Sequence, residues 1–272
     1  MPFARIDPTL EMYYEVHDFA DPWREHETVV LHAGNMKDHR LWYAWIPMLS
    51  SQYRVVTLDA RGHGRSTVPP PKYRWSMQGF ARDLKGLLDH LEIDRAHLIG
   101  ETTGGPITLQ FALDYPARVE TLTQCSAFFK PNPASPTPDD HKLIRELGLE
   151  KWVRQKMGRR VAPGQDPGYA EWYATVMLGN SQQVAEETLE YLGTNDMSDL
   201  LPKVSVTTLI LTGEHSETRP QWSEPMHALM PAAKLVVIPG AHGFVQHTAP
   251  RQCVDAWLDF VGAVSAARNQ AL

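Results

Sequence analysis

The chain of 272 residues has only two cysteines, Cys125 and Cys253. Two cysteines do not make a disulfide framework, and the sequence has no Cys-x-x-Cys pair for metal or redox chemistry. An isolated cysteine usually behaves as a small buried apolar residue, and we expect that role for both. The sequence therefore suggests neither a disulfide-stabilised scaffold nor a metal centre, and we expect no metal and no organic cofactor.

Excess positive charge is also lacking, because 26 Lys and Arg stand against 32 Asp and Glu, for a net charge of -6. The densest basic feature is the pair Arg159-Arg160. Nucleic acids and anionic membranes both require a concentrated positive patch. We therefore expect neither as a partner, and instead expect a small-molecule substrate.

Long apolar runs are absent as well. No stretch approaches the roughly 18 consecutive apolar residues that a membrane-spanning helix needs. The first residues, MPFARIDPTLEMYYEVHD, show no positive segment followed by an apolar one, so we expect no signal peptide. The expectation that follows is a cytoplasmic protein.

Short β-rich runs alternate with helical patterns, which is typical of a mostly parallel sheet flanked by helices. Most of the runs are continuously apolar, as strands buried on both faces should be. The expected strands are Thr28–His32, Arg54–Leu58, Ala96–Ile99, Glu120–Gln124, Thr207–Leu211 and Lys234–Ile238, after an antiparallel edge hairpin with Ile6, Leu10, Met12, Tyr14 and Val16. The expected helices are Leu41–Leu49, Met77–Leu91, Pro106–Tyr115 and Pro250–Ala267.

Residues 130–204 interrupt this alternation. A proline-rich stretch, Lys130–Pro138, leads into helical segments rich in Trp, Tyr and Met. We predict an α/β core of residues 1–129 and 205–272, with residues 130–204 as an inserted helical cap. The insertion begins after the carboxyl end of a strand, where α/β sheets bind ligands, and this position favours a lid over helices that merely complete the core.

The strongest local motif is Gly100-Glu-Thr-Thr-Gly-Gly105, which follows an expected strand and opens an expected helix. This is the context of a nucleophile elbow, a sharp turn in which only small residues fit two positions on either side of the nucleophile. Thr102 would carry the exposed hydroxyl. The backbone N–H of Thr103 would begin the next helix and could donate to a developing oxyanion.

Three further motifs carry a family resemblance, namely Leu31-His-Ala-Gly34, Asp59-Ala-Arg-Gly-His-Gly-Arg-Ser66 and Pro239-Gly-Ala-His-Gly-Phe244. With the elbow, their order and spacing resemble the α/β-hydrolase superfamily from about residue 10 to 265. The expected fold is a mostly parallel eight-stranded sheet flanked by helices, with an inserted helical cap. Esterase and lactonase members with a Gly-Glu-Ser-x-Gly-Gly elbow look most similar.

The resemblance assigns roles to several residues. His242 is the implied catalytic base, and Thr102 takes the place of the usual serine. The implied oxyanion donors are the backbone N–H groups of Thr103 and of Gly34 or Asn35. The aromatic residues expected to line a substrate pocket are Phe128, Phe129, Trp152, Trp172 and Tyr173.

The chain departs from the family pattern at two positions. A threonine nucleophile carries an extra methyl group that stiffens its side chain, so slower acylation is expected. Ser216 stands where the triad aspartate is expected, and Glu217 and Glu214 are the candidate replacements, with no acid at all as a third possibility. Glu101, next to the nucleophile position, is expected to be a buried or pocket-rim carboxylate.

The sequence thus predicts a hydrolase of carboxylic esters or lactones that forms an acyl-enzyme on Thr102, with an apolar or aromatic substrate. Two alternatives remain open. One is a lyase or cofactor-free oxygenase that uses His242 without covalent chemistry. The other is a ligand-binding protein, or a Ser-to-Thr variant with weakened catalysis. The fold alone does not choose among them, because this fold supports many functions.

Overall fold

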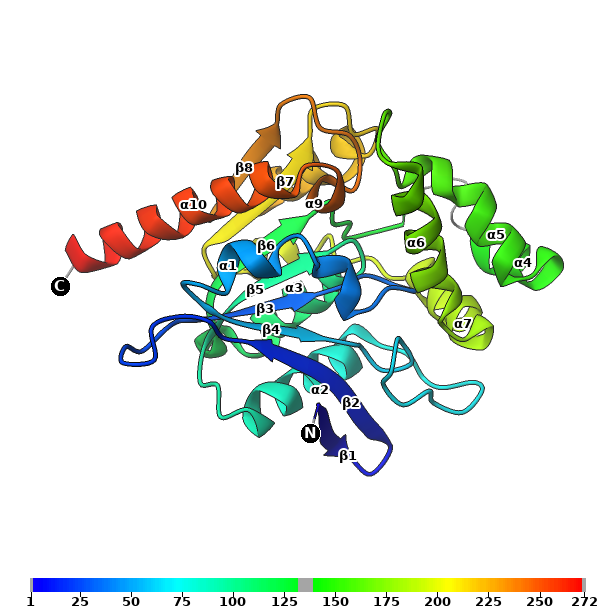
Figure 1. Cartoon of the computed structure of the whole chain (residues 1–272), viewed down its shortest axis with the longest axis horizontal. Coiled ribbons are helices and arrows are strands. Elements are labelled where there is room, and N and C mark those ends of the chain that lie inside the picture. Colours follow the sequence, from blue (N-terminus) through cyan, green and yellow to red (C-terminus); the bar gives the residue numbers. More distant parts are fainter. Residues whose placement is uncertain (1, 132–138, 271–272) are drawn as a thin grey trace.

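The computed structural model describes residues 2–131 and 139–270, which form a mixed sheet with helices on both faces (Figure 1). The strand order is β1-β2-β4-β3-β5-β6-β7-β8. The β1–β2 and β2–β4 pairs are antiparallel, and all other pairs are parallel. The strands are β1 Phe3–Asp7, β2 Leu10–His17, β3 Thr28–His32, β4 Arg54–Leu58, β5 Ala96–Glu101, β6 Val119–Cys125, β7 Thr208–Gly213 and β8 Ala233–Ile238. The predicted fold class and the edge hairpin are confirmed.

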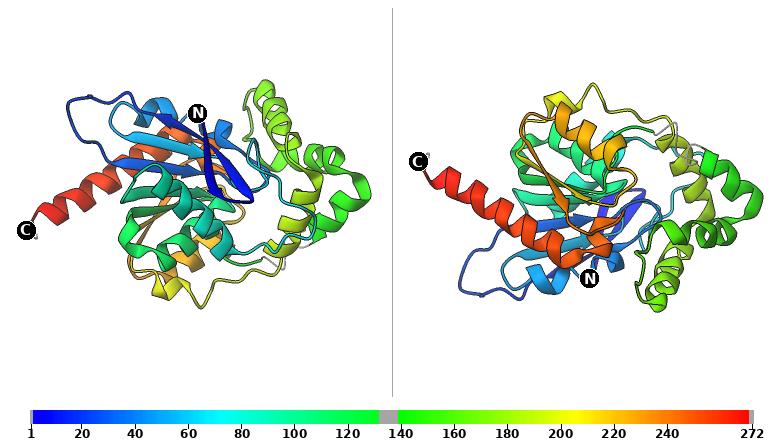
Figure 2. Two further views of the ribbon diagram at one scale, coloured as in Figure 1. Left: turned by 90° about the horizontal axis from the view of Figure 1, so that it is seen from below. Right: turned by 90° about the horizontal axis from the view of Figure 1, so that it is seen from above.

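The central strands are apolar along their whole length because helices cover both faces of the sheet, as Figure 2 shows from two sides. One face packs against α2 (Met77–His90), α3 (Gly104–Asp114) and α8 (Glu224–Leu229). The other face packs against α1 (Ile46–Leu49) and α10 (Pro250–Gln270). Every residue of β3 and β5 is buried.

The expectation of one helix over Leu41–Leu49 was wrong. The segment is divided into a 3₁₀ helix, η1 (His39–Trp42), and the short α1. Pro47 lacks an N–H group and fits only in the first turn of a helix, which is where α1 places it. The short helices α8 and α9 (Val245–Thr248) were not expected from the sequence.

The insertion between β6 and β7 is helical, as predicted, and lies beside the sheet at the right of Figure 1. Its helices, here called the cap helices, are α4 Asp140–Leu147, α5 Leu149–Lys156, α6 Pro167–Leu178 and α7 Gln182–Leu192. They share a hydrophobic cluster with Met36 and Leu41 of the core. Of the proline-rich segment Lys130–Pro138, residues 132–138 lie outside the described residues, and the proposed cap limits at 130 and 204 stay a prediction.

A buried asparagine connects the cap helices with the core loops. Asn180, between α6 and α7, accepts a hydrogen bond from the Gly64 N–H at 3.0 Å. Its side-chain nitrogen donates to the Met36 carbonyl oxygen at 3.1 Å. The cap is therefore fastened both to the loop after β3 and to the loop after β4.

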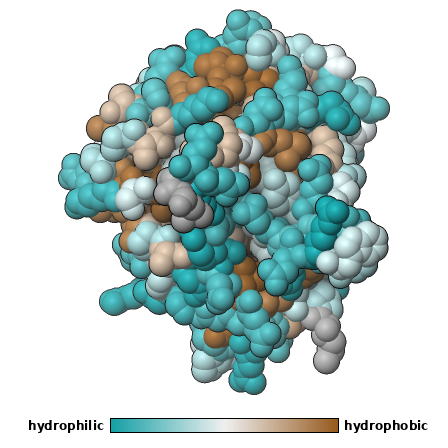
Figure 3. All heavy atoms as spheres, turned by 90° about the vertical axis from the view of Figure 1, so that its left-hand side faces the viewer, coloured by the Kyte–Doolittle hydropathy of each residue, from teal (hydrophilic) through white to brown (hydrophobic). Residues whose placement is uncertain are grey.

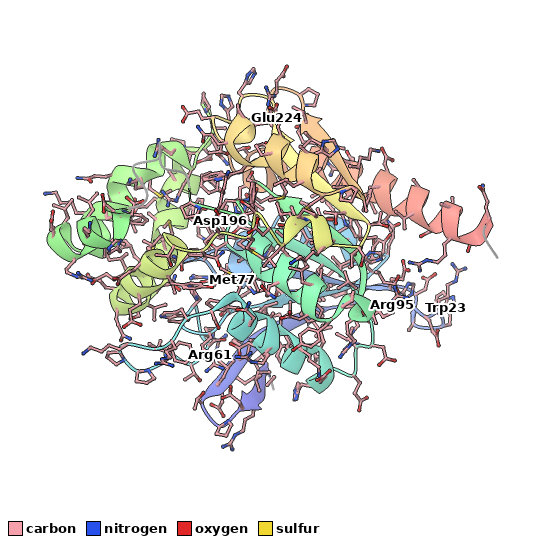
Figure 4. All side chains as sticks on the ribbon, turned by 180° about the vertical axis from the view of Figure 1, so that it is seen from behind. Trp23, Arg61, Met77, Arg95, Asp196 and Glu224 are labelled. Atoms are coloured by element: carbon pink, nitrogen blue, oxygen red, sulfur yellow. The ribbon has the colours of Figure 1, made fainter. Side chains whose placement is uncertain are left out.

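The opposite end of the molecule is formed by the loop between β2 and β3 and by the end of α10. Phe19 and Trp23 of that loop are each 75% exposed, and Trp23 is labelled far from the cap helices in Figure 4. The face turned to the viewer in Figure 3 is mostly hydrophilic, with separate apolar patches. No helix in the described part of the chain is both long and apolar enough to cross a membrane.

Candidate active site

A strained turn between β5 and α3 presents Thr102. Its φ angle is 47°, in the left-handed region that a β-branched residue rarely adopts. A Cβ atom added to Gly100 would lie 2.4 Å from the Gly104 carbonyl oxygen, and one added to Gly104 would lie 2.3 Å from that of His32. Only glycine fits at both positions. The local geometry is that of a nucleophile elbow.

A cavity of about 740 Å³ opens above the elbow, between the carboxyl ends of the strands and the cap helices. Thr102, Thr103 and His242 all line it. Its aromatic lining residues are Phe128, Trp152, Trp222 and Phe244, and its Lys and Arg lining residues are Lys37, Lys156, Arg159 and Arg160. The volume suits a small organic molecule. Another hollow, of about 680 Å³, lies against α7 and contains no elbow residue.

Two of the five aromatic residues expected in the pocket, Phe128 and Trp152, line the cavity. Phe129 and Tyr173 are instead fully buried in hydrophobic clusters, and neither is a lining residue. Trp172 is not a lining residue either and packs edge-on against Tyr43, with 5.2 Å between ring centroids. The sequence gives residue type but not the direction of each side chain, and this explains the three differences.

A buried ion pair, Lys37 and Glu101, lies next to the Thr102 side chain. The Lys37 Nζ atom is 2.8 Å from Oε1 and 2.6 Å from Oε2 of Glu101, and 3.2 Å from Oγ1 of Thr102. Gln246 donates a further hydrogen bond to Glu101 Oε2 at 2.6 Å. The sequence analysis expected a buried or rim carboxylate at Glu101 but missed Lys37. A carboxylate buried beside a nucleophile requires a cationic partner, and this rule could have prompted a search for one.

The ionisation of this cluster follows from its surroundings. Burial alone would raise the pKa of Glu101, but the charge of Lys37, together with the contacts to His247 and Lys37, holds that pKa well below its usual range. Burial lowers the pKa of Lys37 from its ordinary value, and the Glu101 carboxylate opposes the shift. Burial also lowers the pKa of His247, whose Nε2 lies 3.6 Å from Glu101 Oε2. The geometry fits a carboxylate facing an ammonium group.

The expected oxyanion donors differ in their availability. The Gly34 N–H donates to Glu101 Oε1 at 2.5 Å and is therefore occupied. Within residues 2–131 and 139–270, the N–H groups of Thr103 and Asn35 have no hydrogen-bond partner. The Asn35 side chain accepts a hydrogen bond from Thr188 at 2.9 Å.

His242 lies in the loop after β8, on the same cavity as Thr102. It is half-buried, and its ring centroid is 5.3 Å from that of His215. Among the described residues, His242 forms no hydrogen bond with Thr102 or with a carboxylate. The structure thus brings nucleophile and base candidates to one cavity without joining them directly.

The candidate acids lie near this histidine loop in different environments. Glu217 is exposed on the cavity wall. Glu214 accepts a hydrogen bond from the Gly240 N–H at 2.8 Å. Ser216, at the usual aspartate position, is buried, and its Oγ lies 3.1 Å from that of Thr218. The choice between the two glutamates stays a prediction.

A separate group, Asp38, His39 and Asp59, has ligand atoms within 4.8 Å of one another. Each already has a protein partner: Asp59 Oδ1 lies 2.8 Å from His39 Nδ1, and Asp38 pairs with Arg40 at 2.7 Å. Asp59 also accepts a hydrogen bond from the Arg65 N–H at 2.9 Å. These contacts fold the Asp59–Ser66 turn against the loop after β3, and we assign the group that structural role.

Comparison with known proteins shows to which family this fold belongs. Residues 27–167, just over half of the chain, match the family described as alpha/beta hydrolase fold. The chain belongs to the α/β-hydrolase fold family, and it is an enzyme of the hydrolase type that its relatives' names describe.

Two relatives and one solved structure illustrate the similarity. A protein named carbamate hydrolase RutD from Pantoea ananatis is 40% identical over 223 residues, 78% of each chain. The 3-oxoadipate enol-lactonase 2 of Acinetobacter baylyi is 27% identical over 176 residues, 64% of this chain and 65% of its own. A thermophilic esterase from Thermogutta terrifontis superimposes with a TM-score of 0.79 at 26% identity, covering 94% of each chain. Several other proteins named carbamate hydrolase match over about half of their length.

Proposed function

We propose that this protein hydrolyses a carboxylic ester or lactone through an acyl-enzyme on Thr102, with His242 as base. The observation that carries the proposal is the strained elbow, which holds the Thr102 hydroxyl on a cavity that His242 also lines. The relatives' names, carbamate hydrolase and enol-lactonase, describe reactions at a carbonyl group and support it.

In the proposed reaction, the Thr102 hydroxyl oxygen attacks the substrate carbonyl carbon and its proton passes to the His242 imidazole. The carbonyl π electrons move onto the carbonyl oxygen, giving a tetrahedral oxyanion that the Thr103 N–H stabilises. Collapse of this intermediate breaks the bond to the leaving alkoxide, which takes the proton from His242. Water, activated by His242, then hydrolyses the acyl-enzyme by the reverse sequence of proton transfers.

The cavity walls support a substrate with an apolar or aromatic part and an anionic group. Phe128, Trp152 and Trp222 supply the apolar surface. The Arg160 guanidinium lies over the rings of Trp152 and Phe244, at 5.4 and 5.8 Å. Arg160 also lines the cavity, and a carboxylate on the substrate would pair with it there, because guanidinium groups bind carboxylates in a planar fork.

A second candidate is His242-dependent catalysis without a covalent intermediate. It is favoured by one observation, the occupation of the Gly34 N–H by Glu101, which removes a usual oxyanion donor. Under this alternative, activity would survive Thr102→Ala and be lost in His242→Ala.

The experiment that tests the proposal compares Thr102→Ala and Thr102→Ser with the parent on a panel of activated aryl esters and lactones. We expect Thr102→Ala to lower kcat by about 10³-fold or more and to abolish the burst of leaving group, since the nucleophile is lost. Thr102→Ser should acylate faster, because it lacks the crowding methyl group. An unchanged rate in folded Thr102→Ala would refute the covalent mechanism.

A further inference from the structure

The nearest polar neighbour of the nucleophile is an ammonium group, and its contacts are fully defined. Lys37 Nζ has three N–H donors, and it lies within hydrogen-bond distance of three oxygens, two on Glu101 and one on Thr102. Lys37 and Glu101 are both buried. The three contacts hold the lysine so that one donor faces the Thr102 hydroxyl oxygen.

This contact fixes how the hydroxyl can react. Lys37 has no acceptor while it is charged, so the Thr102 oxygen accepts its hydrogen bond. The hydroxyl proton is then directed away from Lys37 and is available to a base on the cavity side. The positive charge also favours the oxygen as it develops negative character during attack.

The Gly34 N–H is not available as an oxyanion donor, so a side chain near the elbow can take that role beside the N–H groups of Thr103 and Asn35, which are free within the described part of the chain. Gly34 lies so close to the elbow that a Cβ atom there would be 1.9 Å from Thr102 Oγ1, yet its N–H is bound to Glu101. Once the Thr102 oxygen bonds to a carbonyl carbon, the carbonyl oxygen is attached to that same carbon. It therefore comes next to the atom that Lys37 already contacts.

We propose that Lys37 is a catalytic residue, the cationic oxyanion donor that acts in place of the Gly34 backbone N–H, with Glu101 as its positioning residue. The inference rests on the proposed function. In the attack step, the proton still goes from Thr102 to His242, and the carbonyl π pair still becomes the oxyanion. Lys37 keeps all its protons and shifts one hydrogen bond from the Thr102 oxygen to the oxyanion.

The test removes both charges of the pair together. Lys37→Met alone would leave the buried Glu101 carboxylate without its cationic partner, which is strongly destabilising, whereas Lys37→Met/Glu101→Gln removes both charges of the pair. A matched control is Arg61→Met/Asp83→Asn, which removes another buried ion pair, at 2.7 Å, outside the cavity. Thermal unfolding, kcat and KM are measured for each with an activated aryl ester.

We expect the Lys37→Met/Glu101→Gln variant to fold and to lose about 10²- to 10³-fold in kcat with little change in KM, as the loss of one oxyanion donor does. The Arg61→Met/Asp83→Asn control should keep its kcat. A folded Lys37→Met/Glu101→Gln variant with kcat within about threefold of the parent would overturn the role of Lys37. If Thr102→Ala is inactive in the same series, the proposed function survives that result; if it is active, the proposed function fails as well.

The pH profile of Glu101→Gln gives a second, independent measurement should the double variant not fold. The ionisable groups facing Lys37 are Glu101 from β5, His247 from α9, Arg160 after η4 (Met157–Arg159) and Tyr173 from α6. Without the carboxylate, the pKa of Lys37 falls further. The alkaline limb of kcat should therefore move to lower pH, since the ammonium form is required. An unmoved limb, or a rate that rises as Lys37 loses its proton, would contradict the cationic role.

Discussion

The two sides of the cavity that hold the proposed reacting groups differ in how tightly they are ordered. On the elbow side, Thr102, Lys37 and Glu101 are joined by short contacts beneath the surface. On the histidine side, His242 is half-buried, and Glu217 is exposed. The elbow side resembles a preorganised electrostatic site, whereas the histidine side lacks the aspartate that usually orients the base.

On the proposed mechanism, the chain relies on the Lys37 charge next to Thr102 more than on a complete triad. Ser216 at the aspartate position cannot stabilise an imidazolium as a carboxylate does. The Lys37 ammonium can lower the energy of the same transition state from the other side.

Replacement of His242 by Ala should lower kcat by about 10³-fold or more, because the general base is lost. The Thr102→Ala/His242→Ala double variant should be little slower than either single one, since residues that act as a unit are not additive. His215→Ala serves as the control, because its ring is a neighbour of His242 at 5.3 Å but has no proposed role. The measurement is kcat of each variant with an aryl ester under steady-state conditions. If His215→Ala loses as much kcat as His242→Ala, the effect comes from disturbed packing of the two histidine loops and not from loss of the base.

Gly34→Ala should lower kcat by about 10²-fold, because its Cβ atom would lie 1.9 Å from Thr102 Oγ1 and displace the hydroxyl. Gly262→Ala is the control, since nothing lies within 4 Å of a Cβ atom there. Burst kinetics would separate slower acylation from weaker binding. Normal acylation by Gly34→Ala would show that the elbow side is more tolerant than its contacts indicate.

The two candidate acids should respond differently. Glu217→Gln is expected to reduce kcat by about tenfold, because Glu217 shares the cavity wall with His242. Glu214→Gln should reduce it less, since that carboxylate is already hydrogen-bonded to the Gly240 N–H. Comparison of kcat for the two variants measures which one supports the base. Equal, unchanged rates would leave the histidine side with no acid.

Arg160→Met should raise KM by about tenfold for an ester that carries a carboxylate, through loss of a charge-assisted hydrogen bond. A neutral ester of similar shape should bind as before. Lys151→Met, at an exposed position on α5, controls for the change in net charge. The KM ratio between charged and neutral esters is the quantity to compare. If this KM ratio is the same in the parent and in Arg160→Met, the proposal that the substrate carries an anionic group is wrong.

The smallest effect concerns stability against acid. Burial lowers the pKa of His32 to about 4 from its ordinary value of 6.5. Between these values the unfolded chain binds more protons than the folded one, so the free energy of unfolding falls as the pH is lowered. The expected slope is about 1 kcal/mol per pH unit in that window. Urea unfolding at several pH values should show a shallower slope for His32→Gln than for the parent, and an equal slope would contradict the burial effect.

The fold could be predicted from the sequence because its signals are local. Continuous apolar runs gave the parallel strands, and the glycines around Thr102 identified the elbow, whose positive φ the structure contains. The division of the segment 41–49 was missed because a single proline, Pro47, determines where α1 can begin.

Much of the site could not be predicted, because it depends on contacts between distant segments. Lys37 and Glu101 are 64 positions apart, and nothing in either local motif shows that they meet. Trp222 and Phe244 line the cavity, whereas Phe129 and Tyr173 turn into the core. Residue type alone does not tell whether an aromatic side chain faces the core or a ligand, because tertiary packing sets its direction.

The hydrogen bonds of Asn180 connect the cap helices with the segment that carries Lys37. One of its hydrogen bonds holds the carbonyl of Met36, the residue immediately before Lys37. A substrate that tilts α6 or α7 on entering would therefore pull on the segment that carries the ammonium group. The cap helices and the segment that carries Lys37 are therefore joined through one side chain, and a shift of one is expected to move the other.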